Sequence, residues 1–208
     1  FLSPRDSLHI DFTADPAITG TTASLNNHLD DLRGMINANR RYIDQLELYR
    51  QPAARLSFVL DSLESVYLSA HQAFEDKHPV PRLFAEKVKA DISYRNKLCQ
   101  VAHPAVHMKW TGNQLPLDAN YFEVLGKGHF STPALLKSLD YVLFLDSYLD
   151  AQAAGEYKYD IYFEAPMEKI HPKYDEIQGL EAHPKIKDYL AFEHLNRSMD
   201  NYGVTYLE

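Results

Sequence analysis

The sequence predicts a mainly α-helical fold, a helical bundle of five to seven helices with a short N-terminal β element. Apolar residues recur at spacings of three and four over most of the chain, which is the period of a helix with one buried face. Proline and glycine interrupt this pattern at short intervals, so we expect short loops between the helices, as in a bundle. Only residues 1–20 show the alternation of apolar and polar residues that is typical of strands.

Residues 1–20 form the predicted β element. Leu8, Ile10 and Phe12 alternate with polar residues, and a second short apolar run follows at residues 17–19. Two short strands are too few for an independent sheet. They either pack on the helices that follow or are the remaining edge of a preceding β-domain.

The helical domain is expected to span residues 21–206. The apolar stripes predict helices over about 22–51, 53–77, 81–102, 118–125, 132–155, 168–179 and 184–201. The helix that opens at Thr132-Pro133 is apolar around most of its circumference, so we expect it at the centre of the core. The helix that starts at Pro81 is expected to stop before His103-Pro104, which leaves residues 104–117 irregular.

Charge and composition exclude several classes of function. The net charge is −8 at pH 7, and the basic residues are scattered along the sequence rather than clustered as in a phosphate-binding surface. No stretch approaches the roughly 18 apolar residues of a transmembrane helix. Gly126-Lys127-Gly128 lacks the spacing of a dinucleotide- or phosphate-binding loop. We therefore expect no nucleic-acid partner, no transmembrane segment in this chain and no cofactor.

Cys99 is the only cysteine, so this chain can form neither an internal disulfide nor a CxxC redox pair. His103 and His107 follow it at intervals of four, a spacing that would place three metal-ligand types on one face of a continuous helix. Pro104 lies between the two histidines, and we interpret the segment as a helix end. Cys99 is expected to be a partly buried structural residue rather than a nucleophile.

A second group with metal-ligand spacing consists of His71, Glu75 and His78. Two imidazoles and one carboxylate can bind zinc, but an ordinary polar helix face has the same pattern. We predict no catalytic residue and no metal ligand in either group.

Tyr157, Tyr159, Tyr162 and Phe163 lie in a segment where no helical stripe explains the aromatic residues. Exposed tyrosines supply contact area at low entropic cost, so these four residues are the candidate interaction surface. The alternative is that these tyrosines pack over the bundle and keep their hydroxyls in water.

Four stretches carry a family resemblance. The first is SPRDSLHIDF…ITGTTASLNNHL, with Pro4, Asp6, Ser7, Leu8, Gly20, Ala23, Leu25, Asn26 and Asn27 as the matching residues. The others are PRLFAEKVKADISYRNKLCQVAHP at 81–104, LLKSLDYVLFLDSYLDA at 135–151 and KIKDYLAFEHLNRSMDNYG at 185–203. Together they resemble the region that precedes the thioredoxin fold in extracytoplasmic TlpA-like lipoproteins of the AhpC/TSA, thioredoxin-like class.

This resemblance implies a non-catalytic helical domain of an envelope thiol:disulfide oxidoreductase or isomerase. The catalytic CxxC would belong to a thioredoxin-like domain C-terminal to this segment, and the parent protein would be lipid-anchored and periplasmic. The helical region would position that domain or dock a protein or peptide partner. The chain starts at Phe1 without a methionine, and Leu207-Glu208 is typical of a cloning scar, so we expect both ends to be cut.

Two alternatives remain open. The chain could act as a stand-alone helical module that binds a peptide or glycan through the tyrosine-rich segment. It could also be a metal-dependent hydrolase built from histidines that are distant in sequence.

Overall fold

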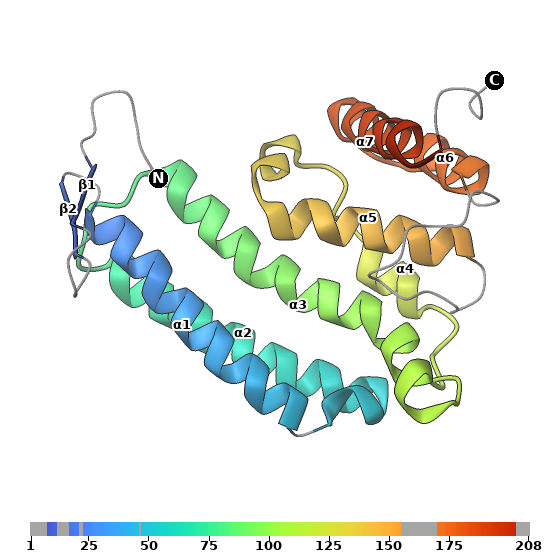
Figure 1. Cartoon of the computed structure of the whole chain (residues 1–208), viewed down its shortest axis with the longest axis horizontal. Helices are drawn as coiled ribbons and strands as arrows, with labels where there is room; N and C mark the ends of the chain where they lie inside the picture. The colour runs from blue at the N-terminus through green and yellow to red at the C-terminus, as the bar shows by residue number, and fades with distance from the viewer. Residues whose placement is uncertain (1–7, 12–16, 21–22, 46, 155–169, 203–208) are drawn as a thin grey trace.

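The computed structural model describes residues 8–11, 17–20, 23–45, 47–154 and 170–202. In chain order the elements are β1 (Leu8–Asp11), β2 (Ala17–Gly20), α1 (Ala23–Gln45), η1 (Leu48–Arg50), α2 (Ala53–Glu75), α3 (Arg82–Thr111), α4 (Tyr121–Gly126), η2 (Pro133–Lys137), α5 (Leu139–Ala154), α6 (Ile170–Gly179) and α7 (Pro184–Tyr202), where η marks 3-10 helices. The mainly α-helical class is therefore confirmed, with seven α-helices in the described residues (Figure 1). None of the described helices has both the length and the apolar character needed to cross a membrane.

The two strands form an antiparallel hairpin beside the start of α1 (Figure 1). Leu8 is opposite Gly20 and Asp11 is opposite Ala17. The alternating pattern predicted the first strand and the short apolar run predicted the second, and β2 contacts α1. Phe12, which we expected in the first strand, lies outside the described residues.

The N-terminal half is built from α1, α2 and one face of α3. Figure 1 shows α1 and α2 side by side and α3 lying along them. Their shared interior, here called the N-terminal cluster, contains Leu25, Leu32, Tyr67, Phe84, Val88 and Ile92. The three residues from α3 recur every four positions, so they occupy one face of the helix.

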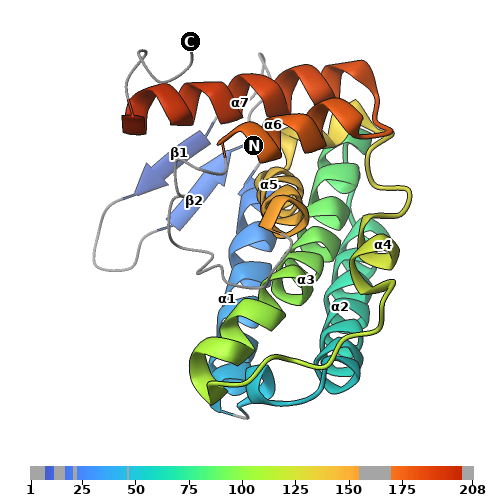
Figure 2. The same cartoon turned by 90° about the vertical axis from the view of Figure 1, so that its right-hand side faces the viewer.

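The C-terminal half packs against the other side of α3 (Figures 1 and 2). The C-terminal cluster combines α3 residues with buried residues of α5, α6 and α7: Ala90, Tyr94, Val101, Tyr141, Phe144, Leu145, Leu149, Ile177, Ile186 and Leu190. The helix α5 is central to this cluster, as expected, because Tyr141, Phe144 and Leu145 are fully buried. A single helix, α3, is therefore covered on two sides.

The prediction that the third helix stops before His103-Pro104 is wrong. The helix α3 continues to Thr111 and ends at Gly112, whose φ of 73° is the left-handed conformation common after helix ends. Proline lacks the N–H that would bond to the carbonyl of Gln100 four residues earlier. The hydroxyl of Tyr121 donates to that carbonyl instead, at 2.9 Å. Burial on two sides and this substitute donor keep the helix continuous through Pro104.

The apolar helix also starts later than predicted. Residues Pro133–Lys137 form the 3-10 helix η2, and α5 begins at Leu139. Ser138 separates them: its hydroxyl oxygen accepts a hydrogen bond from the Tyr141 N–H at 3.2 Å, as a helix N-cap does. The same hydroxyl donates to Asp91 on α3. The sequence signal at Thr132-Pro133 therefore marked a preceding turn rather than the start of α5.

A partly buried group of charges, here called the clamp and made of Asp146, Asp150, Lys173 and Arg197, joins α5, α6 and α7. Lys173 Nζ lies 2.7 Å from one carboxylate oxygen of Asp146 and 2.7 Å from one of Asp150, and its side chain is only 7% exposed. Arg197 of α7 binds the other oxygen of Asp146 at 2.6 Å. Burial alone would raise the pKa of Asp146, but the charges of Lys173 and Arg197 outweigh it and hold that pKa below its ordinary value.

We expect Tyr121→Phe to lower the free energy of unfolding by about 1–3 kcal/mol, because it leaves the Gln100 carbonyl without a donor. In a Pro104→Ala background residue 104 regains an N–H, so the same substitution should cost less. Urea unfolding of the four proteins in this double-mutant cycle measures the difference. An equal cost in both backgrounds would show that the tyrosine does not substitute for the missing N–H.

Lys173→Met should destabilise the protein by about 3–5 kcal/mol, because it leaves the partly buried carboxylate of Asp150 without its cation and that of Asp146 with Arg197 alone. Arg197→Met is the matched control. That arginine side chain is 48% exposed, so its loss should cost about 1 kcal/mol or less. Chemical denaturation at neutral pH compares the two, and equal effects would contradict the assigned role of Lys173.

Candidate functional site

His103 and His107 lie one turn apart on α3, as their spacing requires, and both contact η1. Nε2 of His103 is 3.1 Å and Nδ1 of His107 is 2.9 Å from the carbonyl oxygen of Tyr49. A carbonyl can only accept, so each of these nitrogens carries a proton and donates. A protonated ring nitrogen has no lone pair for a metal. The two histidines therefore bind the backbone of η1 to α3.

Cys99 lies one turn before His103 and is half-buried. It packs with Tyr49 and Val59 against a small apolar cluster of Leu48, Leu56 and Leu60. The sequence predicted a partly buried structural cysteine, and this surrounding is consistent with that role. The thiol thus lies beside η1 and α2.

His71 forms a contact that the sequence did not indicate. Its Nδ1 is 2.9 Å from Nε2 of His28 on α1, and both rings are buried in the N-terminal half. On the opposite side His71 Nε2 is 4.0 Å from Glu75, whose other carboxylate oxygen is 2.7 Å from Lys89 Nζ on α3. His78, the third residue of the predicted group, stacks on Phe74.

The carboxylate of Glu75 favours one arrangement of protons in this chain of contacts. An N–H of His71 that points toward the carboxylate is electrostatically favourable, whereas a lone pair there would be repelled. His71 then accepts from the N–H of His28. Burial is the main cause that lowers the pKa of both His28 and His71, so both rings are held neutral. The result is a polar contact between α1, α2 and α3.

The four residues of the candidate interaction surface lie outside the described residues: Tyr157, Tyr159, Tyr162 and Phe163. Within the described residues, no group of three or more His, Cys, Asp or Glu side chains is placed to hold a metal ion.

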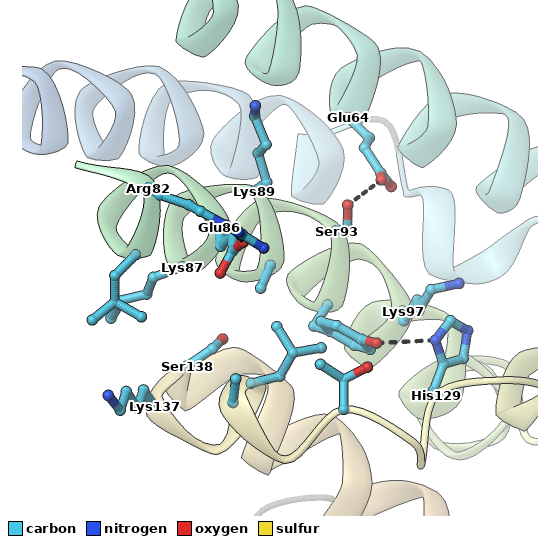
Figure 3. Close-up of a pocket in the computed structure, with 16 residues that line it drawn as sticks. Glu64, Arg82, Glu86, Lys87, Lys89, Ser93, Lys97, His129, Lys137 and Ser138 are labelled. Atoms are coloured by element: carbon cyan, nitrogen blue, oxygen red, sulfur yellow. Dashed lines mark hydrogen bonds and ion pairs between the residues drawn. The ribbon is translucent and has the colours of Figure 1, made fainter. Parts of the chain in front are cut away.

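A cavity of about 710 Å³ lies between α3 and η2. Figure 3 shows this cavity in close-up, with side chains from α3 on one wall and from residues 129–138 on the other. Glu64 of α2 closes one side. We call it the α3–η2 cavity, and its volume is within the range of small-molecule sites.

Tyr94 and His129 form a hydrogen-bonded pair in the wall of this cavity. The Tyr94 hydroxyl is 3.0 Å from Nδ1 of His129 (Figure 3). Burial raises the pKa of Tyr94 to about 12. Burial, with a smaller contribution from the charge of Lys97, lowers the pKa of His129 to about 4. At neutral pH the pair therefore consists of a neutral phenol and a neutral imidazole.

The sequence reasoning missed this cavity, although one signal was present. Arg82, Glu86, Lys89, Ser93 and Lys97 are spaced by four, three, four and four, so they share one face of α3. In the linear sequence the three basic residues among them look scattered, and only the helical period places them on one face. The partners of this face in residues 129–138 come from a distant segment that no local pattern reveals.

Comparison with known proteins gives no further guide to the site. The chain matches no protein-family model, and searches of curated proteins and of solved structures find no match. The resemblance to TlpA-like lipoproteins therefore stays a prediction, and the function has to be inferred from the side chains themselves.

The buried histidines predict that stability falls on acidification. Burial lowers the pKa of His103 to about 4, so between pH 6.5 and pH 4 the unfolded chain binds the proton that the folded protein excludes. The contribution of His103 to the free energy of unfolding is therefore fully present above about pH 6.5, and it decreases as the pH falls. At pH 5 this histidine should contribute a loss of about 2 kcal/mol.

His103→Gln keeps a side-chain N–H near the Tyr49 carbonyl but does not titrate. Urea unfolding at pH 7 and pH 5 should therefore show a smaller pH dependence for this variant. His183→Gln, at an exposed position before α7, is the control. An unchanged pH dependence in His103→Gln would contradict the assignment.

Proposed function

We propose that this chain is a non-catalytic helical domain of an envelope thiol:disulfide oxidoreductase or isomerase, which positions a following thioredoxin-like domain or docks its partner. In this proposal the parent protein is periplasmic and lipid-anchored. The chemistry resides in a CxxC that this chain does not contain.

The observation that carries the proposal is the placement of the lone thiol. Dithiol–disulfide cycling requires a second cysteine to resolve the mixed disulfide. Cys99 is the only cysteine, so no second thiol of this chain can resolve a mixed disulfide, and it packs beside Leu48, Leu56 and Leu60. The histidines closest to it in sequence, His103 and His107, are engaged with the Tyr49 carbonyl. These contacts favour a structural role for the whole region.

The clamp supports a positioning role. In the resemblance, α7 is the last helix before the redox domain. Arg197 of α7 binds Asp146 of α5, and Asp146 also binds Lys173 of α6. Ile186 and Leu190 of α7 are buried in the C-terminal cluster, which includes α3. The orientation of α7 is therefore tied to the core, as a spacer between two domains requires.

The test is insulin reduction in the presence of dithiothreitol. The chain alone should not accelerate the reaction above the reductant background, and Cys99→Ala should behave in the same way. The reading frame that encodes the chain should continue after Tyr206 into a CxxC thioredoxin sequence, and that longer protein should accelerate the reaction. Acceleration by the chain alone that is lost in Cys99→Ala would overturn the proposal.

The same experiments separate the two alternatives. A reading frame that stops near Tyr206 would favour the stand-alone peptide- or glycan-binding module. Loss of partner binding on changing Tyr157, Tyr159 and Tyr162 to Ala, with unchanged circular dichroism, would support that module. Stoichiometric zinc in the purified protein, lost on changing His103 or His107, would favour the hydrolase.

A further inference from the structure

The α3–η2 cavity concentrates positive charge in a chain that is acidic as a whole. Its lining contains five cationic side chains, Arg82, Lys87, Lys89, Lys97 and Lys137, but only two carboxylates, Glu64 and Glu86. The net charge of the full chain is −8. The excess of cations here is therefore opposite in sign to the chain average, and it favours an anionic occupant.

Three of these cations are already held by carboxylates. Arg82 binds Glu86 at 2.6 Å, Lys87 binds Asp91, and Lys89 binds Glu75 at 2.7 Å. Their charge is therefore largely neutralised by the protein.

The other two cations, Lys97 and Lys137, form no ion pair with a carboxylate in the part of the chain that the structure describes. Glu64, the acidic lining residue that comes from α2, accepts hydrogen bonds from Ser93 and Asn96. The two lysines lie at opposite ends of the cavity (Figure 3).

Lys97 and His129 together form a polar end of the cavity (Figure 3). We assign the Tyr94 hydroxyl as the donor to Nδ1 of His129, and in this tautomer the proton of the neutral ring is on Nε2. This end of the cavity therefore offers an ammonium group and a ring N–H donor. Two donors of this kind suit a carboxylate, whereas phosphate sites usually add several backbone N–H groups at a helix N-terminus.

The walls between the two lysines are mostly apolar. Leu83, Ala90 and Tyr94 come from α3, and Ala134 and Leu135 come from η2. Apolar walls do not compensate a small inorganic anion for its lost hydration. They do stabilise a bound hydrocarbon chain, because apolar surface on both sides is removed from water. The cavity thus combines one polar end with an apolar body, the usual arrangement of a small-molecule site.

We propose that the α3–η2 cavity binds an organic carboxylate with an unbranched apolar chain, whose charged group lies at Lys97 and His129 and whose hydrocarbon lies along Ala90, Tyr94 and Leu135. This site is independent of the thioredoxin proposal, because it uses none of the residues on which that proposal rests. The helical domain would then bind a small-molecule ligand in addition to the role proposed above.

The experiment uses decanoate with the full chain, and it follows backbone amide shifts by NMR and heats by calorimetry. Decanol tests the apolar body without the charge, and inorganic phosphate tests the charge without the apolar body. Decanoate should bind saturably and shift the amides of Ala90, Lys97 and His129, while decanol and phosphate should bind at least about tenfold more weakly.

Lys97→Gln should weaken decanoate binding about tenfold, the effect of removing a charge-assisted hydrogen bond. Lys127→Gln removes the same charge from an exposed position outside the cavity and is the matched control. Circular dichroism and a thermal melt confirm that both variants are folded. Decanol binding as tightly as decanoate, an unchanged affinity in Lys97→Gln, or no saturable binding at millimolar decanoate would each overturn the proposal.

Discussion

The fold depends on the burial of one helix on two sides. Through Phe84, Val88 and Ile92, α3 completes the N-terminal cluster, and through Ala90, Tyr94 and Val101 it completes the C-terminal one. A helix in this position cannot shift or tilt without opening both interiors, and close-packed interiors do not deform gradually. The hairpin with α1 and α2 on one side, and α5 to α7 on the other, therefore behave as parts attached to a common axis (Figure 1).

The polar contacts add specificity to this apolar frame. His28 with His71 fixes α1 against α2, the Tyr49 carbonyl fixes η1 against α3, and Lys173 fixes α6 against α5. Each is a buried or partly buried interaction whose partners would be costly to separate. Hydrocarbon contacts alone would allow neighbouring registers of the helices. These pairings select one register at each interface.

The sequence predicted the class and most helix limits, because helical period and proline or glycine positions are local signals. The predicted end of the third helix before Pro104 was wrong, because the helix continues with a hydrogen bond that Tyr121 supplies from a separate helix. The sequence reasoning also missed His28, although this residue lies between Leu25 and Leu32 on the buried stripe of α1. The α3–η2 cavity was beyond local reasoning, because its polar end needs Lys97 and His129 from separate segments. Long-range partners, rather than propensities, account for each of these misses.

The hydrogen bond from the Tyr121 hydroxyl to the Gln100 carbonyl links the residue types that evolution can place at positions 104 and 121. A proline at position 104 costs less stability while position 121 carries a hydroxyl that reaches the Gln100 carbonyl. If residue 104 mutates to one with an N–H, the constraint on residue 121 is relaxed. The two positions, in different helices, should therefore covary among homologues, with tyrosine at 121 accompanying proline at 104.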